Sequence, residues 1–138
     1  MRKIIESIRN DDGNVYIEFL AGILLLMIVL VSIISVLSVF SIKNQLDNAT
    51  GLLIQQAKMT GSTELSEEIS NLKAKTGLDF DVSFDGTEYM QGSSYKVQLG
   101  DDIQITLSYD YKIGAGDLFS FPLTVRSSYM GLSQHFHK

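Results

Sequence analysis

The hydrophobic and polar positions of the chain fall into regions with different periods. Residues 19–42 form an uninterrupted apolar stretch of 24 residues, without a charge and without proline. A helix rises about 1.5 Å per residue, so a stretch of this length can cross a hydrocarbon core of roughly 30 Å. The pattern therefore predicts a membrane-spanning helix.

Helical spacing continues beyond the apolar stretch. The apolar positions that follow are Leu46, Ala49, Leu53 and Ala57. The first strong helix-ending signal after them is Gly61, because glycine readily adopts the left-handed conformation that closes a helix. A helix over residues 14–59 would be about 69 Å long, with one half in lipid and the other half forming the spine of an outer domain.

A second, shorter helix is predicted between Gly61 and Gly77. Ser62 or Thr63 can cap its N-terminus. Its first turn is acidic and its last turn is basic, which suits the helix dipole. Its expected buried face consists of Leu65, Ile69 and Leu72.

After Gly77 the apolar residues alternate with polar ones, which is typical of strands with one buried face. The expected strands cover residues 78–84, 95–99, 103–113 and 123–129. Short polar turns separate them, so we expect an antiparallel sheet of about four strands whose apolar face is covered by the helices. The predicted fold class is α+β, with a long N-terminal helix, a short second helix and a C-terminal sheet.

A distinctive motif stands at the front edge of the apolar stretch. Glu18 lies directly against it, five residues after Gly13 and immediately before Phe19. A carboxylate at that depth costs several kcal/mol unless a partner compensates its charge. A short polar leader ending in glycine, four further residues, and then glutamate, an aromatic residue and a long apolar helix together resemble the processing site of type IV pilin-like precursors. The motif is most similar to the Tad (tight adherence) branch, the TadE-like minor pilins or pseudopilins.

The resemblance implies a specific maturation step. In such families a prepilin peptidase cuts after the glycine on the cytoplasmic side of the membrane, so Asn14 would become the first residue and Glu18 the fifth. Residues 1–13 would be the leader, residues 14–60 the transmembrane and spine helix, and residues 61–138 the extracytoplasmic α+β domain. The implied partners are the prepilin peptidase, other pilin-like subunits and the lipid bilayer.

Small residues on the apolar stretch suggest a surface for helix packing. They are Gly22, Ser32, Ser35, Ser38 and Ser41. The serines recur every three residues, and such a stripe lets helices approach closely and form interhelical hydrogen bonds. A serine can instead donate back to its own helix, and for any single serine both interpretations stay open.

Charge predicts an orientation in the membrane and disfavours one class of partner. Arg2, Lys3 and Arg9 precede the span, whereas only Lys43 follows it immediately. The positive-inside rule then places the N-terminus in the cytoplasm and the C-terminal domain outside a single-pass cytoplasmic membrane protein, which assembly would carry to a cell-surface pilus. The formal net charge of −5 disfavours nucleic-acid binding.

Candidate chemistry is sparse. Cysteine is absent, so disulfides and thiolate metal sites are excluded. The acidic residues between Asp79 and Glu88 lack the glycine and glutamate spacing of a calcium loop. His135 and His137 have no third ligand nearby in sequence and are expected to be a solvated tail. We find no nucleophile with a recognisable base, and so we expect neither an enzyme nor a cofactor.

The sequence is compatible with two functions. The first is a structural pilin-like subunit that is processed after Gly13 and assembled through its N-terminal helix. The alternative is an unprocessed single-span protein whose outer domain binds a ligand or partner. Retention or loss of residues 1–13 separates them.

Overall fold

The chain folds as an α+β protein built on one long helix. The computed structural model describes residues 2–115 and 119–138, with side chains described for residues 13–114 and 119–138. The elements are α1 (Arg2–Thr60), α2 (Ser66–Thr76), β1 (Asp81–Ser83), β2 (Asp102–Ala115) and β3 (Phe119–Leu132). This architecture confirms the predicted fold class.

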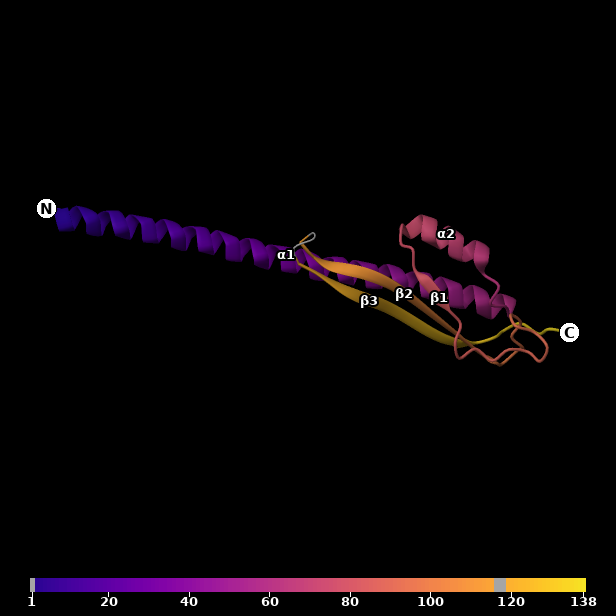
Figure 1. Ribbon diagram of the computed structural model, residues 1–138. Helices are drawn as coiled ribbons and strands as arrows, with labels where there is room; N and C mark the ends of the chain where they lie inside the picture. Colours follow the sequence, from indigo (N-terminus) through magenta and orange to yellow (C-terminus); the bar gives the residue numbers. More distant parts are fainter. Residues whose placement is uncertain (1, 116–118) are drawn as a thin grey trace.

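Helix α1 runs without interruption through the apolar stretch and into the folded domain. Its N-terminal half projects alone, while its C-terminal half lies along the sheet (Figure 1). It ends at Thr60, where Gly61 takes a left-handed φ of 60° and its N–H donates to the Ala57 carbonyl at 2.7 Å. The continuous helix predicted over residues 14–59 is therefore confirmed.

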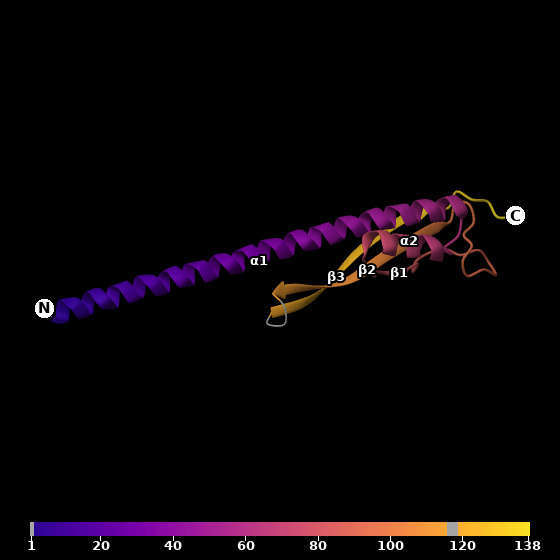
Figure 2. The same ribbon diagram turned by 90° about the horizontal axis from the view of Figure 1, so that it is seen from above.

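The sheet is antiparallel with strand order β1-β2-β3. Most of it is one long hairpin, in which Asp102 pairs with Leu132 at one end and Ala115 with Phe119 at the other. Figure 2 shows that the C-terminal end of β2 and the N-terminal end of β3 point toward the N-terminus of α1 and diverge from the helix.

The core lies between the sheet and the C-terminal half of α1. The helix contributes Ile42, Leu46, Ala49, Leu53 and Ala57, and the sheet contributes Ile103, Ile105, Leu107 and Val125, all buried. The helical residues recur every three or four positions, so they form one stripe that faces the sheet. Each predicted apolar position of the outer half of α1 is thus buried.

Two predicted strands are corrected by the structure. Only Asp81–Ser83 of the expected first strand pairs with β2, and residues 95–99 form one isolated bridge, between Lys96 and Ser62. The sheet therefore has three strands rather than four. Phe80 and Val97 are nevertheless fully buried, so the alternating pattern reflected burial of side chains and not a continuous ladder.

Helix α2 begins later than its expected caps. Its N-cap position is Leu65, which has no side-chain capping bond. The Ser62 hydroxyl accepts from the Glu64 N–H, and the Thr63 N–H donates to the Tyr95 carbonyl, so both residues stabilise the connection before the helix. The predicted end is confirmed, because Gly77 is left-handed at φ 70° and its N–H donates to the Lys73 carbonyl.

The C-terminal tail was expected to be solvated, but in the structure it is docked against the domain. The side-chain amide of Gln98 donates to the His137 carbonyl and accepts from the His137 N–H. The His137 ring lies 2.9 Å from the Gly61 carbonyl, and the Gln134 N–H donates to the Lys58 carbonyl. The tail thereby joins the end of α1 to the loop that contains Gln98.

Candidate membrane and assembly site

Between Phe19 and Phe40, α1 presents large apolar side chains around its whole circumference. One span within Gly13–Thr60 is long and apolar enough to cross a membrane, and none of its most apolar segment is buried by the rest of the chain. An all-round apolar helix that nothing in the chain covers is suited to a hydrocarbon environment. The sequence prediction of one candidate membrane span near the N-terminus is confirmed at this level.

The residues of the predicted processing motif lie at the start of this exposed surface. Gly13, Asn14, Glu18 and Phe19 are all exposed and all lie within α1. A Cβ added at Gly13 would meet no atom within 4 Å, so the position is open on its outer side. Among the side chains that the structure describes, Glu18 forms no ion pair.

The serine stripe satisfies most of its own hydrogen-bonding capacity. The hydroxyls of Ser32, Ser35 and Ser38 donate to the carbonyls four residues earlier at 2.8, 2.8 and 2.9 Å. Ser41 accepts from the Gln45 side chain at 3.3 Å. The donors of the first three serines are thus used within the helix, which leaves their small size as the feature available for packing. Gly22 is also open, since a Cβ added there would meet no atom within 4 Å.

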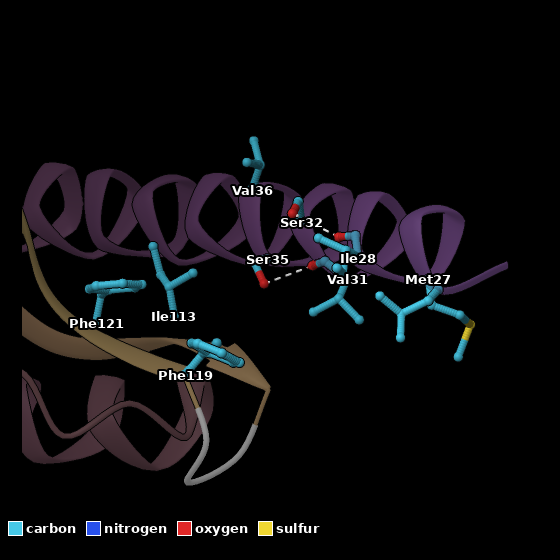
Figure 3. A pocket seen from close by; sticks show the side chains of 11 residues that line it. Met27, Ile28, Val31, Ser32, Ser35, Val36, Ile113, Phe119 and Phe121 are labelled. Carbon is cyan, nitrogen blue, oxygen red and sulfur yellow. Dashed lines mark hydrogen bonds between the residues drawn. The ribbon is translucent and has the colours of Figure 1, made fainter. Parts of the chain in front are cut away.

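A groove separates the span from the closed end of the β2–β3 hairpin. It has a volume of about 660 Å³ and is bordered by Leu24, Met27, Ile28, Val31, Ser32, Ser35 and Val36 of α1 and by Ile113, Gly114, Phe119 and Phe121 of the hairpin. Figure 3 shows Ile113, Phe119 and Phe121 on the side of the hairpin that faces the helix. Two of the predicted packing serines, Ser32 and Ser35, therefore face a segment of their own chain.

A polar cluster fixes the hairpin to α1 just outside the apolar stretch. The Lys43 ammonium donates to Asp47 at 2.8 Å and to the Arg126 carbonyl at 2.6 Å. The Ser127 hydroxyl, which is buried, donates to the same Asp47 oxygen at 2.6 Å. We call Lys43, Asp47 and Ser127 the helix–hairpin clamp.

The clamp perturbs the ionisation of its carboxylate. Hydrogen bonds from Lys43 and Ser127 lower the pKa of Asp47 below its ordinary value of 3.8, although burial acts in the opposite direction. Hydrogen bonds donated to a carboxylate stabilise its charged form and so lower its pKa. The charged clamp is thus the stable form at neutral pH.

The two histidines lie close together but lack companions for a metal site. Their ring centroids are 4.6 Å apart in an edge-to-face arrangement. Across the described ranges, no three histidine, cysteine, aspartate or glutamate side chains are grouped so that they could hold a metal ion.

Sequence reasoning missed the clamp and the apolar hairpin end. Asp47 and Ser127 are 80 positions apart, and a single buried serine in a strand gives no sign of its partner. Phe119 and Phe121 could have been found, because they continue the alternation of Leu123 and Val125, but Pro122 argued against a strand there. Strand β3 is an edge strand, where proline is tolerated.

Comparison with known proteins gives one family. Residues 23–138 match the family model described as "Domain of unknown function (DUF4320)". No curated protein and no solved structure matches the chain. The matched region starts inside the apolar stretch, so Gly13 and Glu18 lie outside it.

Proposed function

The chain belongs to the DUF4320 family, and we propose that it is a structural, non-enzymatic pilin-like (pseudopilin) subunit of a Tad or type IV pilus-like assembly. In this proposal a prepilin peptidase removes residues 1–13 after Gly13. The mature subunit then sits in the cytoplasmic membrane with its domain outside, and it joins other subunits through its N-terminal helix.

One observation carries the proposal. A single helix, α1, is apolar and exposed between Phe19 and Phe40 and packed under a small α+β domain from Ile42 to Ala57. A subunit that is stored in a bilayer and later assembled through helix contacts needs these two properties in one rigid element. The buried stripe holds the domain on the helix, and the exposed half remains available to lipid or to neighbouring helices.

Glu18 has a defined role in this proposal. Cleavage after Gly13 would create a positively charged amino group on Asn14, and in an apolar helix bundle that group would pair with Glu18 of a neighbouring subunit. The pair would form only in the correct register, because an unpaired carboxylate in an apolar environment is costly. The exposure of Glu18 and its lack of an ion pair among the described side chains are consistent with this role.

The small residues would set how closely neighbouring helices approach. Gly22 and the serine at position 41 lie away from the groove, whereas Ser32 and Ser35 border it. Since most of the serine donors bond within their own helix, van der Waals packing of small side chains is the expected contribution, as in other membrane helix pairs.

The first experiment measures the intact mass of the native protein. Loss of residues 1–13 is expected in the wild type, and replacement of Gly13 by a bulky residue should leave the precursor uncut. Met1 on the mature native protein would contradict the proposal and favour an unprocessed single-span binding protein.

The second experiment separates assembly from insertion. Glu18→Ala should still insert and still be cut after Gly13, yet it should fail to co-assemble, because the neighbour's amino group loses its partner. Glu18→Asp keeps the charge but shortens its reach by one methylene group, so an intermediate result is expected. Cross-linking of processed subunits measures assembly, and wild-type assembly of Glu18→Ala would exclude the charge pair.

A further inference from the structure

The apolar face of the hairpin continues past the end of the core. Opposite residues in an antiparallel pair share a face, so the pairs Leu107–Ser127 and Ile113–Phe121 belong to the face that meets α1. Phe119 is two residues before Phe121 on the same strand and belongs to this face too. Ser127 is buried, whereas Phe121 and Phe119 are 69% and 70% exposed. The hairpin thus presents two uncovered phenylalanines toward the helix where the two elements separate.

These phenylalanines border the groove described above, whose other wall is the membrane span itself. Among the residues that the structure describes, no charged side chain lines the groove. Its helical wall reaches from Leu24 to Val36, and its hairpin wall carries Phe119 (Figure 3). The groove is therefore continuous with the exposed apolar surface of the span.

The position of the groove along α1 places it at bilayer depth. If the inner hydrocarbon boundary lies at Glu18, a core of roughly 30 Å ends about 20 residues later, near Ser38. Every helical residue of the groove precedes Ser38. The groove then lies within the hydrocarbon region, and the described ends of β2 and β3 stand beside the span below the level of the helix–hairpin clamp.

We infer that the apolar face at the C-terminal end of β2 and the N-terminal end of β3 inserts into the outer leaflet, and that lipid acyl chains fill the groove between Phe119, Phe121 and α1. Water in this groove would leave both phenylalanines and the facing side of the span hydrated, whereas acyl chains remove that apolar surface from water. Lipid is the occupant because the same wall of α1 is lipid-facing on either side of the groove. This inference rests on the membrane insertion contained in the proposed function.

The backbone limits how deeply the hairpin can enter. At this end β2 pairs only with β3, since β1 pairs with residues 106–108, so both edges of the hairpin are open. Unpaired backbone groups are not tolerated deep in hydrocarbon. Pro122 removes one such donor, and the exposed Lys112 on the opposite face can extend its ammonium toward the headgroups. These features limit the hairpin end to the outer leaflet, so that it does not cross the bilayer centre.

The absence of tryptophan from the sequence allows a direct test. Single variants Phe119→Trp, Leu25→Trp and Phe136→Trp are reconstituted as full-length protein in vesicles, with and without phosphatidylcholine brominated on its acyl chains. Leu25 is an exposed position of the span that does not border the groove, and Phe136 is an exposed phenylalanine of the C-terminal tail. All three positions are exposed in the chain, so the substitutions should not disturb its fold, which circular dichroism checks.

The inference predicts that brominated lipid removes most of the emission of Phe119→Trp and Leu25→Trp but not of Phe136→Trp. Bromines close to the headgroup should quench Phe119→Trp more than bromines near the end of the acyl chain. Aqueous acrylamide should quench Phe136→Trp alone.

Two outcomes would overturn the inference while leaving the proposed function intact. In the first, Leu25→Trp is quenched by lipid but Phe119→Trp is quenched by acrylamide as strongly as Phe136→Trp. In the second, Phe119→Trp is shielded from both quenchers and becomes accessible when lipid is added in excess, which would make the groove a contact between copies. If Leu25→Trp itself escapes quenching by lipid, membrane insertion fails, and the proposed function fails with it.

Discussion

The two halves of α1 have the same backbone geometry but bury different surfaces. Between Phe19 and Phe40, apolar side chains cover every face and none of the most apolar segment is buried. From Ile42 to Ala57, the buried apolar side chains form one stripe, and the five residues of that stripe are nearly inaccessible. The width of the apolar surface around the helix, more than the total number of apolar residues, thus distinguishes a helix suited to lipid from a helix that packs one face against a sheet.

If the buried stripe of α1 is what stabilises the sheet, the sheet should fold with the C-terminal part of α1 and without the membrane span. A fragment of residues 41–138 should be soluble, with mixed helix and strand content by circular dichroism. A fragment of residues 62–138 should be unfolded or aggregated, because Ile103, Ile105 and Leu107 would lose the surface that covers them. A folded sheet in the shorter fragment would contradict this prediction, because it would show that the sheet is stable without α1.

Two adjacent leucines of α1 test whether only the buried stripe contributes to stability. Leu53 is 1% exposed and Leu52 is 53% exposed. In the 41–138 fragment, Leu53→Ala should lower the free energy of unfolding by about 2–5 kcal/mol, since it leaves a cavity in the core. Leu52→Ala should change it by less than about 0.5 kcal/mol. Urea denaturation measures both, and equal effects would contradict the assigned stripe.

The junction at the end of α1 should respond strongly to a single methyl group. At Gly61 an added Cβ would lie 2.8 Å from the His135 Cβ and 2.9 Å from the Val97 carbonyl oxygen, in addition to the strain of its positive φ. Gly92 also has a positive φ, but nothing lies within 4 Å of an added Cβ. Gly92→Ala should cost about 1 kcal/mol from backbone strain alone, and Gly61→Ala should cost clearly more. Thermal denaturation of the two variants isolates the effect of the docked tail.

The helix–hairpin clamp should have the smallest effect and a defined pH dependence. Because the pKa of Asp47 is lowered on folding, its contribution is fully present above the ordinary value of 3.8 and is lost as the pH falls through the lower folded pKa. Both side chains of the ion pair are partly exposed, so solvent screening limits the contribution to about 1 kcal/mol or less. Asp47→Asn should lower stability by this amount at pH 7 and flatten its acid dependence, whereas Asp110→Asn, in an exposed hydrogen bond to Thr124, should change stability at pH 7 less. Urea denaturation at a series of pH values measures both variants.

Local patterns of the sequence predicted much of this fold. The apolar stretch, the stripe from Leu46 to Ala57 and the glycines at both helix ends act over a few residues, so they can be recognised from spacing alone. The alternation of apolar and polar residues also predicted most of the β2–β3 hairpin.

What local patterns could not supply were contacts between distant segments. Phe80 and Val97 alternate like strand residues, yet they lie outside the sheet's ladder, because only the side chain had to be buried. The tail was expected to be solvated because nothing near His137 in sequence reveals that Gln98 binds it. The processing and assembly residues, from Gly13 to Ser41, remain predictions, since their proposed partners are other molecules.

The absence of a break in α1 over its described residues means that the domain cannot move independently of the span. From Lys43 to Thr60 the helix extends roughly 27 Å, so a change in tilt of about 20°, the average inclination of membrane helices, would displace its outer end by about 9 Å. Membrane helices adjust their tilt to bilayer thickness. In the proposed membrane orientation, the thickness of the surrounding bilayer would thus set the lateral position of the outer end of the helix and of the acidic domain attached to it.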